Sequence, residues 1–224
     1  MVGTSAVSDV TISATVEQIA GSDDETGTGL FQALASGSRR IDLHLSSGEY
    51  SEVRNLSAPP AGKWSGPDGV LHPVAFHNLL SEPVWFFPAI GIAPLFGGSA
   101  SSYTVTYIGH ESYDSQSVEH IRVSQVSPLA TPTGGVTHEH LTAVEFYLDS
   151  STLFPAAMKF SIHPDNNALL DIPVEIRFAD YRSTSGLQAP YHVQEFVNGG
   201  LVLDLQAQSI TINTGISSNQ FSIQ

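Results

Sequence analysis

Residues 172–182, IPVEIRFADYR, decide the fold that this sequence predicts. Apolar and polar side chains alternate along this run, and one face carries Ile172, Val174, Ile176 and Phe178. A period of two is the repeat of a β-strand, whose successive side chains point to opposite faces of a sheet. A strand with one apolar and one polar face is typical of an antiparallel sheet that meets water on one side. The run therefore predicts an antiparallel sheet with one apolar face.

Three neighbouring runs between residues 141 and 223 alternate in the same way. They are LTAVEFYLD (141–149), AAMKFSIHP (156–164) and YHVQEFVNGGLVLDLQAQSITIN (191–213). Asn198-Gly199-Gly200 interrupts the last run, and these residues accept the positive φ angles of a tight hairpin turn. The C-terminal part of the chain is therefore predicted to be a series of antiparallel strands.

The N-terminal part also predicts strands. The alternating runs are DVTISATVEQI (9–19), TGLFQALASG (28–37), RRIDLHLSSGEYSEVRNL (39–56) and SYTVTYIGHESYDSQSVEHIRVSQV (102–126). Residues 57–73 are rich in Pro and Gly, which predicts an irregular loop. The best helical candidate is 72–91, where Pro83 and Pro88 restrict it to two short helices.

About ten strands and little helix indicate a single all-β domain over residues 1–224. Such a sheet cannot leave a whole apolar face in water. Either it curls around the short helices as a half-barrel, or a second sheet covers it in a β-sandwich. We expect the half-barrel, because the aromatic segment 85–87 provides a natural filling for the concave side.

Composition excludes several classes of function. The formal net charge is −14, from 22 acidic and 8 basic residues, which disfavours binding to nucleic acid or to an anionic membrane. The chain has no cysteine, so disulfides and thiol chemistry are absent. The longest apolar stretch, 83–96, is shorter than the ~20 residues that a transmembrane helix needs. Residues 1–10 lack the features of a signal peptide, so we expect either a cytosolic protein or one whose leader was removed.

The hairpin region 172–196 resembles a recurring pattern of the LolA/LolB-like lipoprotein-carrier superfamily. There a strand ends in a polar residue and Tyr-Arg, a Gly turn follows, and a Pro opens the next strand. The positions that match this pattern are Phe178, Asp180, Tyr181, Arg182, Gly186 and Pro190. Asp149, Pro155 and the terminal Phe221 match in the flanking strands. The resemblance is best over 141–223, and the N-terminal strand pattern departs from the longer N-terminal helix of the family.

The resemblance implies a curved antiparallel half-barrel whose apolar concave side is partly plugged by short helices. It also implies a non-enzymatic bacterial envelope protein, periplasmic or secreted, that binds a lipid or a lipoprotein acyl chain without a cofactor. The expected lining of the cavity is Trp85, Phe86, Phe87, Ile90, Phe96, Phe146, Val174, Ile176 and Phe178. The alternative is a structural or protein-interaction module whose concavity is completely filled, and a hydrolase is the third hypothesis. The oligomeric state stays open.

Catalytic and metal-binding patterns are weak. His138-Glu139-His140 has the His-x-His spacing that directs two rings to one face of a strand, but no third ligand is near in the sequence. No Gly-x-Ser-x-Gly motif or nucleotide-binding glycine loop occurs. Carboxylate pairs such as Glu145 with Asp149 suit a solvated sheet face better than a glycosidase. Arg182 is expected to pair with Asp180 rather than with a ligand. We therefore predict neither a catalytic residue nor a metal site.

Overall fold

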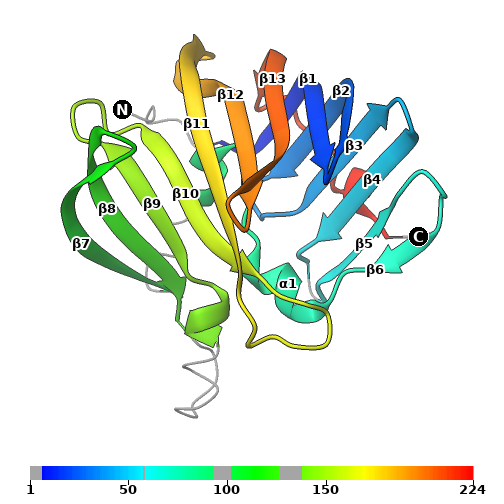
Figure 1. The fold of residues 1–224 in the computed structure, drawn as a ribbon, viewed down its shortest axis with the longest axis horizontal. Helices are drawn as coiled ribbons and strands as arrows, with labels where there is room; N and C mark the ends of the chain where they lie inside the picture. Colours follow the sequence, from blue (N-terminus) through cyan, green and yellow to red (C-terminus); the bar gives the residue numbers. More distant parts are fainter. Residues whose placement is uncertain (1–6, 58, 93–101, 127–137, 224) are drawn as a thin grey trace.

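A computed structural model describes residues 7–57, 59–92, 102–126 and 138–223. Its strands form one 13-stranded antiparallel sheet in the order β6-β5-β4-β3-β2-β1-β13-β12-β11-β10-β9-β8-β7 (Figure 1). The sheet curves around the short helix α1, which lies at its concave side (Figure 1). The predicted half-barrel is confirmed, and the β-sandwich is not observed among the described residues.

The strands follow one another as antiparallel neighbours within each half of the chain. The first half contains β1 (Asp9–Ala20), β2 (Asp23–Leu34), β3 (Arg39–Leu45), β4 (Gly48–Asn55), β5 (Ala61–Ser65) and β6 (Leu71–Pro73). The second half contains β7 (Tyr103–Tyr113), β8 (Gln116–Gln125), β9 (Val144–Asp149), β10 (Pro155–Ile162), β11 (Ile172–Thr184), β12 (Leu187–Val197) and β13 (Gly200–Ile212). The helices are α1 (Phe76–Ser81), α2 (Pro88–Ile92) and the short 3-10 helix η3 (Ser218–Phe221).

The first and last strands join the two halves at the middle of the sheet. Val10 on β1 lies opposite Ile212 on β13, and the pairing continues to Gln18 opposite Leu203. Beyond the end of β13, the Asp9 carboxylate accepts hydrogen bonds from the backbone N–H groups of Thr214 and Gly215 at 2.8 and 3.0 Å. Burial raises the pKa of Asp9, but these hydrogen bonds outweigh it and lower that pKa overall. The ionised carboxylate therefore fastens the chain after β13 to the start of β1.

This topology places the helical segment inside the curve of the sheet. Strands β6 and β7 are the two opposite edges, so the chain that connects them must pass from one edge to the other. The described part of that connection includes the buried residues Val84, Trp85, Phe86, Phe87 and Ile90. The Phe31 ring on β2 packs 6.0 Å from Trp85 and 5.4 Å from Phe86, measured between ring centroids. The connection thus covers the apolar face that the alternating strands create.

Two-residue turns set the register of the C-terminal hairpins. Ser185 and Gly186 have φ angles of 49° and 81° between β11 and β12, and Asn198 and Gly199 have 51° and 78° between β12 and β13. Consecutive positive φ angles match the twist of a tight hairpin, which confirms both predicted turns. Pro190 does not open β12 as expected, because that strand already begins at Leu187.

Three further local predictions were wrong. Phe221 lies in the 3-10 helix η3 and not in a strand. Residues 57–73 do not form an irregular loop, because Ala61–Ser65 pairs with β4 and Leu71–Pro73 pairs with β5. Pro73 is compatible with a strand here because β6 is the edge of the sheet, where a missing backbone donor is tolerated. Residues 138–140 form a helical turn rather than the start of a strand, and the N–H of Thr142 donates to the carbonyl of His138 at 3.1 Å.

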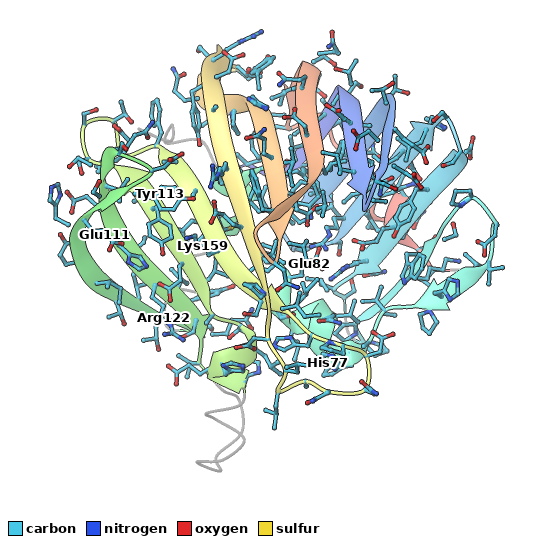
Figure 2. All side chains as sticks on the ribbon, viewed as in Figure 1. His77, Glu82, Glu111, Tyr113, Arg122 and Lys159 are labelled. Atoms are coloured by element: carbon cyan, nitrogen blue, oxygen red, sulfur yellow. The ribbon has the colours of Figure 1, made fainter. Side chains whose placement is uncertain are left out.

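The convex face carries a polar cluster on strands β7 to β11. Figure 2 shows Tyr113, Lys159 and Arg122 projecting from this side of the sheet. The Lys159 Nζ lies 4.8 Å from the Tyr113 ring centroid and 5.0 Å from that of Tyr147. It also pairs with Glu175 at 3.2 Å. The polar half of the alternating pattern therefore forms a solvated outer surface. In the described chain no helix is long and apolar enough to span a bilayer.

Replacing Phe178 by Ala tests the assignment of the strand faces. The ring is buried in the core, so we expect a loss of about 3–5 kcal/mol in the free energy of unfolding. The matched control Ser183→Ala, at an exposed position of the same strand, should change that free energy by less than about 0.5 kcal/mol. Denaturant melts measure both values, and the reverse order would mean that the faces are inverted.

Candidate functional site

The main cavity of the described structure has a volume of about 490 Å³. It lies between strands β3, β4 and β5, the residues around α1, and the β12–β13 hairpin. Its walls combine apolar side chains of the core with charged and polar groups. The lining residues are Gln18, Ile19, Ile41, Leu43, Tyr50, Glu52, Arg54, Trp64, Pro73, Val74, Asn78, Glu82, Trp85, Ile162, Asp165, Glu195, Val202 and Leu203.

Four charged side chains form a network beside this cavity. Arg39 and Arg54 come from neighbouring positions of β3 and β4, and their residues are only 1% and 5% exposed. The Glu52 Oε1 atom accepts from the Nε atoms of both, at 3.1 and 2.9 Å. The Glu82 carboxylate, labelled in Figure 2, pairs with Arg39 through one oxygen and with Arg54 through the other. Two guanidiniums are therefore neutralised by two carboxylates.

The same two arginines also bind the backbone at the end of α1. Arg54 Nη1 donates to the carbonyl of Asn78 at 2.8 Å. Arg39 Nη1 donates to the carbonyls of Glu82 and Pro83 at 3.0 and 2.6 Å. The last carbonyls of a helix lack partners inside the helix and need donors from elsewhere. The network therefore ties the segment that follows α1 to the sheet.

Titration of Glu52 reflects this pairing. Burial raises its pKa, but the Arg54 and Arg39 guanidiniums outweigh burial and lower the pKa to about 2. Glu52 is therefore ionised at all physiological pH values, as a buried carboxylate between two cations must be.

Glu195 on β12 is a fifth titratable group at this site, and its pKa is shifted in the opposite direction to that of Glu52. Burial raises its pKa to about 8, and the nearby Glu82 carboxylate adds to that rise, while Arg39 opposes it. No residue that the structure describes donates a hydrogen bond to its carboxylate. Titratable groups with strongly shifted pKa values in a cavity are characteristic of functional sites.

An aromatic stack extends from the wall of the cavity, which Tyr50 and Trp64 line, toward the edge of the sheet. Tyr50, Trp64 and His72 lie on the consecutive strands β4, β5 and β6. The rings of Tyr50 and Trp64 are 5.8 Å apart at 15°, and those of Trp64 and His72 are 4.4 Å apart at 24°. Parallel stacking of this kind orders the otherwise exposed edge strands.

The predicted cavity residues that the structure describes occupy four different environments. Trp85 lines the 490 Å³ cavity, Ile90 and Phe146 line a second cavity of about 340 Å³, and Val174 borders a third of about 360 Å³. Phe86, Phe87, Ile176 and Phe178 are packed in the core and border none of these three cavities. All eight of these side chains belong to one hydrophobic cluster. Phe96 lies outside the described residues.

Sequence reasoning missed the charged network. The available signal was a charged residue at an apolar-face position of a strand: Arg39 shares the face of Ile41 and Leu43, and Glu195 shares that of Val193 and Val197. The sequence of neither strand shows that Arg39 and Glu195 both lie close to Glu82.

The residues that could bind a metal in the structure differ from those that the sequence suggested. His140 lies near His163 and Asp171, and each histidine Nε2 is 3.0 Å from the Asp171 Oδ1. The donor atoms of these three residues lie within 4.8 Å of one another, whereas His138 does not belong to the group. Two imidazoles and a carboxylate are a donor set that suits zinc. The group lies outside the 490 Å³ cavity.

A hydrogen-bonded Ser-His-Glu chain occurs on strands β7 and β8. Ser117 Oγ lies 3.0 Å from His110 Nε2, and His110 Nδ1 lies 2.9 Å from Glu119 Oε1. The His110 side chain is 59% exposed, and none of the three residues borders the cavities described above. Hydrolysis by such a triad requires a substrate pocket and oxyanion donors in addition to the triad. This chain of contacts therefore gives little support to a hydrolase.

Other candidate groups have structural partners. Arg182 pairs with Asp180, as expected, and the Tyr181 hydroxyl donates to the carbonyl of Pro155 at 2.7 Å. Glu145 pairs with His120 at 2.7 Å, and Asp149 accepts hydrogen bonds within its own turn. These groups stabilise strand ends and the outer surface.

Replacing Glu82 by Ala tests the network. The change leaves the buried Arg39 and Arg54 with one carboxylate between them, so the free energy of unfolding should fall by about 3–5 kcal/mol. Glu17→Ala, at an exposed position of β1, is the matched control and should have an effect below about 0.5 kcal/mol. Equal urea midpoints for both variants would contradict a stabilising role of the network.

The pH dependence of stability tests the environment of Glu195. In the unfolded chain this carboxyl ionises near its ordinary pKa of 4.5, whereas in the folded protein it stays protonated up to about pH 8. The folded state then binds more protons between these values, so stability must fall as pH rises through this window.

Glu195→Gln removes this titration. We expect the variant and the wild type to be similar in stability near pH 4, and the variant to be the more stable protein at pH 8. Glu17→Gln is the control for a general effect of charge. Denaturant melts at four pH values between 4 and 8 measure the difference, and parallel curves for Glu195→Gln and wild type would refute the raised pKa.

Comparison with known proteins gives structural matches only. The sequence matches no protein-family model and no curated protein. A LolA superfamily protein from Nitrosomonas europaea matches with a TM-score of 0.57 and 11% identity over 96% of this chain and 90% of its own. A DUF1329 family protein from Desulfovibrio piger matches with a TM-score of 0.58 and 10% identity over 96% and 90%.

A third match is a domain from Vibrio parahaemolyticus that is named for outer membrane lipoprotein sorting. It has a TM-score of 0.54 and 11% identity, and the alignment covers 95% of this chain and 88% of that one. Three matches over nearly complete chains agree with the curved sheet and the short helices described above. The chain therefore has the LolA-like fold.

Proposed function

We propose that this protein is a non-enzymatic envelope protein, periplasmic or secreted, that binds a lipid or a lipoprotein acyl chain against the concave side of its sheet. The observation that carries the proposal is the 490 Å³ cavity beside Trp85, in the connection between β6 and β7. Pockets for small ligands usually have volumes of about 300–1,000 Å³ and mostly apolar walls with a few polar groups. Ile41, Leu43, Trp85 and Leu203 supply apolar wall area here.

The similarity of this fold to solved structures supports a role in the bacterial envelope. One similar structure is named for lipoprotein sorting and another for the LolA superfamily. Because the identity to both is only 11%, the likeness concerns the arrangement of the sheet and the helices, and the ligand has to be argued from the cavity.

The packing of the core indicates where a bound ligand would lie. Phe86 and Phe87 are completely buried, so the centre of the concavity is filled by the protein itself. An acyl chain would therefore occupy the 490 Å³ cavity next to Trp85. The other predicted residues that the structure describes lie in the core or at the second and third cavities. The complete burial of Phe86 and Phe87 also favours the second candidate function, a protein-interaction module with a filled concavity.

Ligand titration separates the two functions. We expect the tryptophan emission of the intact chain to shift when a diacylated lipopeptide or a neutral lauroyl ester is added, because both tryptophans, Trp64 and Trp85, line the cavity and an apolar ligand displaces water there. Val202→Phe narrows the cavity at a half-buried position and should weaken binding at least about tenfold, by steric exclusion.

Val105→Phe, at an exposed position of β7, is the control and should bind like the wild type. A folded wild-type protein that responds to none of these ligands would refute lipid binding and leave the interaction module as the better account.

A further inference from the structure

We infer that the 490 Å³ cavity takes an amphiphile with a cationic head group, an ammonium paired with the Glu195 carboxylate, and an apolar tail beside Trp85. The inference rests on the proposed function and specifies the chemical class of ligand for the same cavity.

The charges on the cavity wall favour a cation. One guanidinium faces four carboxyl groups there: Arg54 against Glu52, Glu82, Asp165 and Glu195. Neither Lys nor His contributes to the lining. The whole chain has a formal net charge of −14, which attracts cations from a distance and repels anions.

The two guanidiniums at this site are already engaged by carboxylate and carbonyl oxygens. Arg54 donates from Nε and Nη2 to Glu52, from Nη2 to Glu82, and from Nη1 to the carbonyl of Asn78. Arg39 uses Nε for Glu52, Nη1 for the carbonyls of Glu82 and Pro83, and Nη2 for the Glu82 carboxylate. An anionic ligand would have to compete with the Glu52 and Glu82 carboxylates that already pair with both arginines, which disfavours its binding.

Glu195 is the less exposed of the two carboxyl groups on the cavity wall for which no ion pair with a described residue is found, the other being the exposed Asp165. The charged and titratable groups that act on it are Glu82 after α1, Glu52 and Arg54 on β4, Arg39 on β3, and the Tyr50 hydroxyl. Arg39 and Arg54 are already balanced by Glu52 and Glu82, so an ionised Glu195 is the third carboxylate against two guanidiniums. A ligand cation would restore neutrality and supply the missing hydrogen-bond donor or ion-pair partner.

Burial of the carboxyl group makes this binding dependent on pH. With its pKa raised to about 8 by burial and by Glu82, free Glu195 is mostly protonated at neutral pH. An ammonium ion binds to the carboxylate, so binding releases one proton to solvent. Affinity should then rise by up to about tenfold per pH unit from pH 6 toward 8 and level off above it. Binding of an anion to the protonated carboxyl would show the opposite slope.

The experiment compares three probes with the same twelve-carbon tail, each below its micelle concentration. They are dodecyltrimethylammonium, dodecanoate and the neutral dodecyl maltoside, titrated into the intact chain by calorimetry at pH 6, 7 and 8. The quaternary ammonium cannot titrate, so its pH dependence reports on the protein. We expect it to bind at least about tenfold more tightly than dodecanoate at pH 8, with an affinity that increases with pH.

Glu195→Gln should reduce the affinity for dodecyltrimethylammonium at pH 8 at least about tenfold, abolish its pH dependence, and leave dodecyl maltoside unaffected. Glu17→Gln controls for the loss of one negative charge elsewhere, and circular dichroism melts verify that each variant is folded.

The outcomes that overturn the inference differ from those that overturn the proposed function. Equal or tighter binding of dodecanoate, or an unchanged cation affinity in Glu195→Gln, refutes the cationic head group while lipid binding stands. Failure of all three probes to bind refutes both.

Discussion

The buried ion pairs of Arg39 and Arg54 with Glu82 are the interaction on which the rest of this structure depends. A curved sheet with one apolar face is stable only if that face is covered. Here the cover is the chain between the two edge strands, and both arginines attach it to the sheet through the Glu82 carboxylate and through backbone carbonyls. Glu82 thus joins the covering segment to both β3 and β4 by ion pairs.

The same network explains why the site is polar inside an apolar concavity. Two guanidiniums buried among strands need carboxylates, and Glu52 and Glu82 supply them from β4 and from the end of α1. Glu195 then adds a carboxyl group that these cations do not fully compensate, and its raised pKa follows from that surplus and from burial. The charged residues on the apolar face of the sheet therefore have two effects. They anchor the covering segment, and they make part of the cavity wall polar.

The pairing of β1 with β13 has a different role. It joins the two halves of the sheet, each of which is built from strands that are neighbours in the sequence. Val10 and Ile212, by contrast, come from opposite ends of the chain. The core behind Trp85 draws on both halves, from Phe31 on β2 to Ile176 on β11. A cavity between β3, β4 and the β12–β13 hairpin exists only after this long-range pairing forms.

The sequence by itself determined most of the strands outside residues 57–73, the two hairpin turns and the position of α1 and α2, because alternation, Asn-Gly or Ser-Gly pairs and prolines act over a few residues. It also indicated the apolar segment that fills the concavity. Only the tertiary structure decided that Phe86 and Phe87 are core rather than cavity wall, and that Arg39, Glu52, Glu82 and Glu195 meet. The physical reason is that these contacts join residues up to about 150 positions apart, and their energies depend on burial and on charge partners that no local pattern encodes.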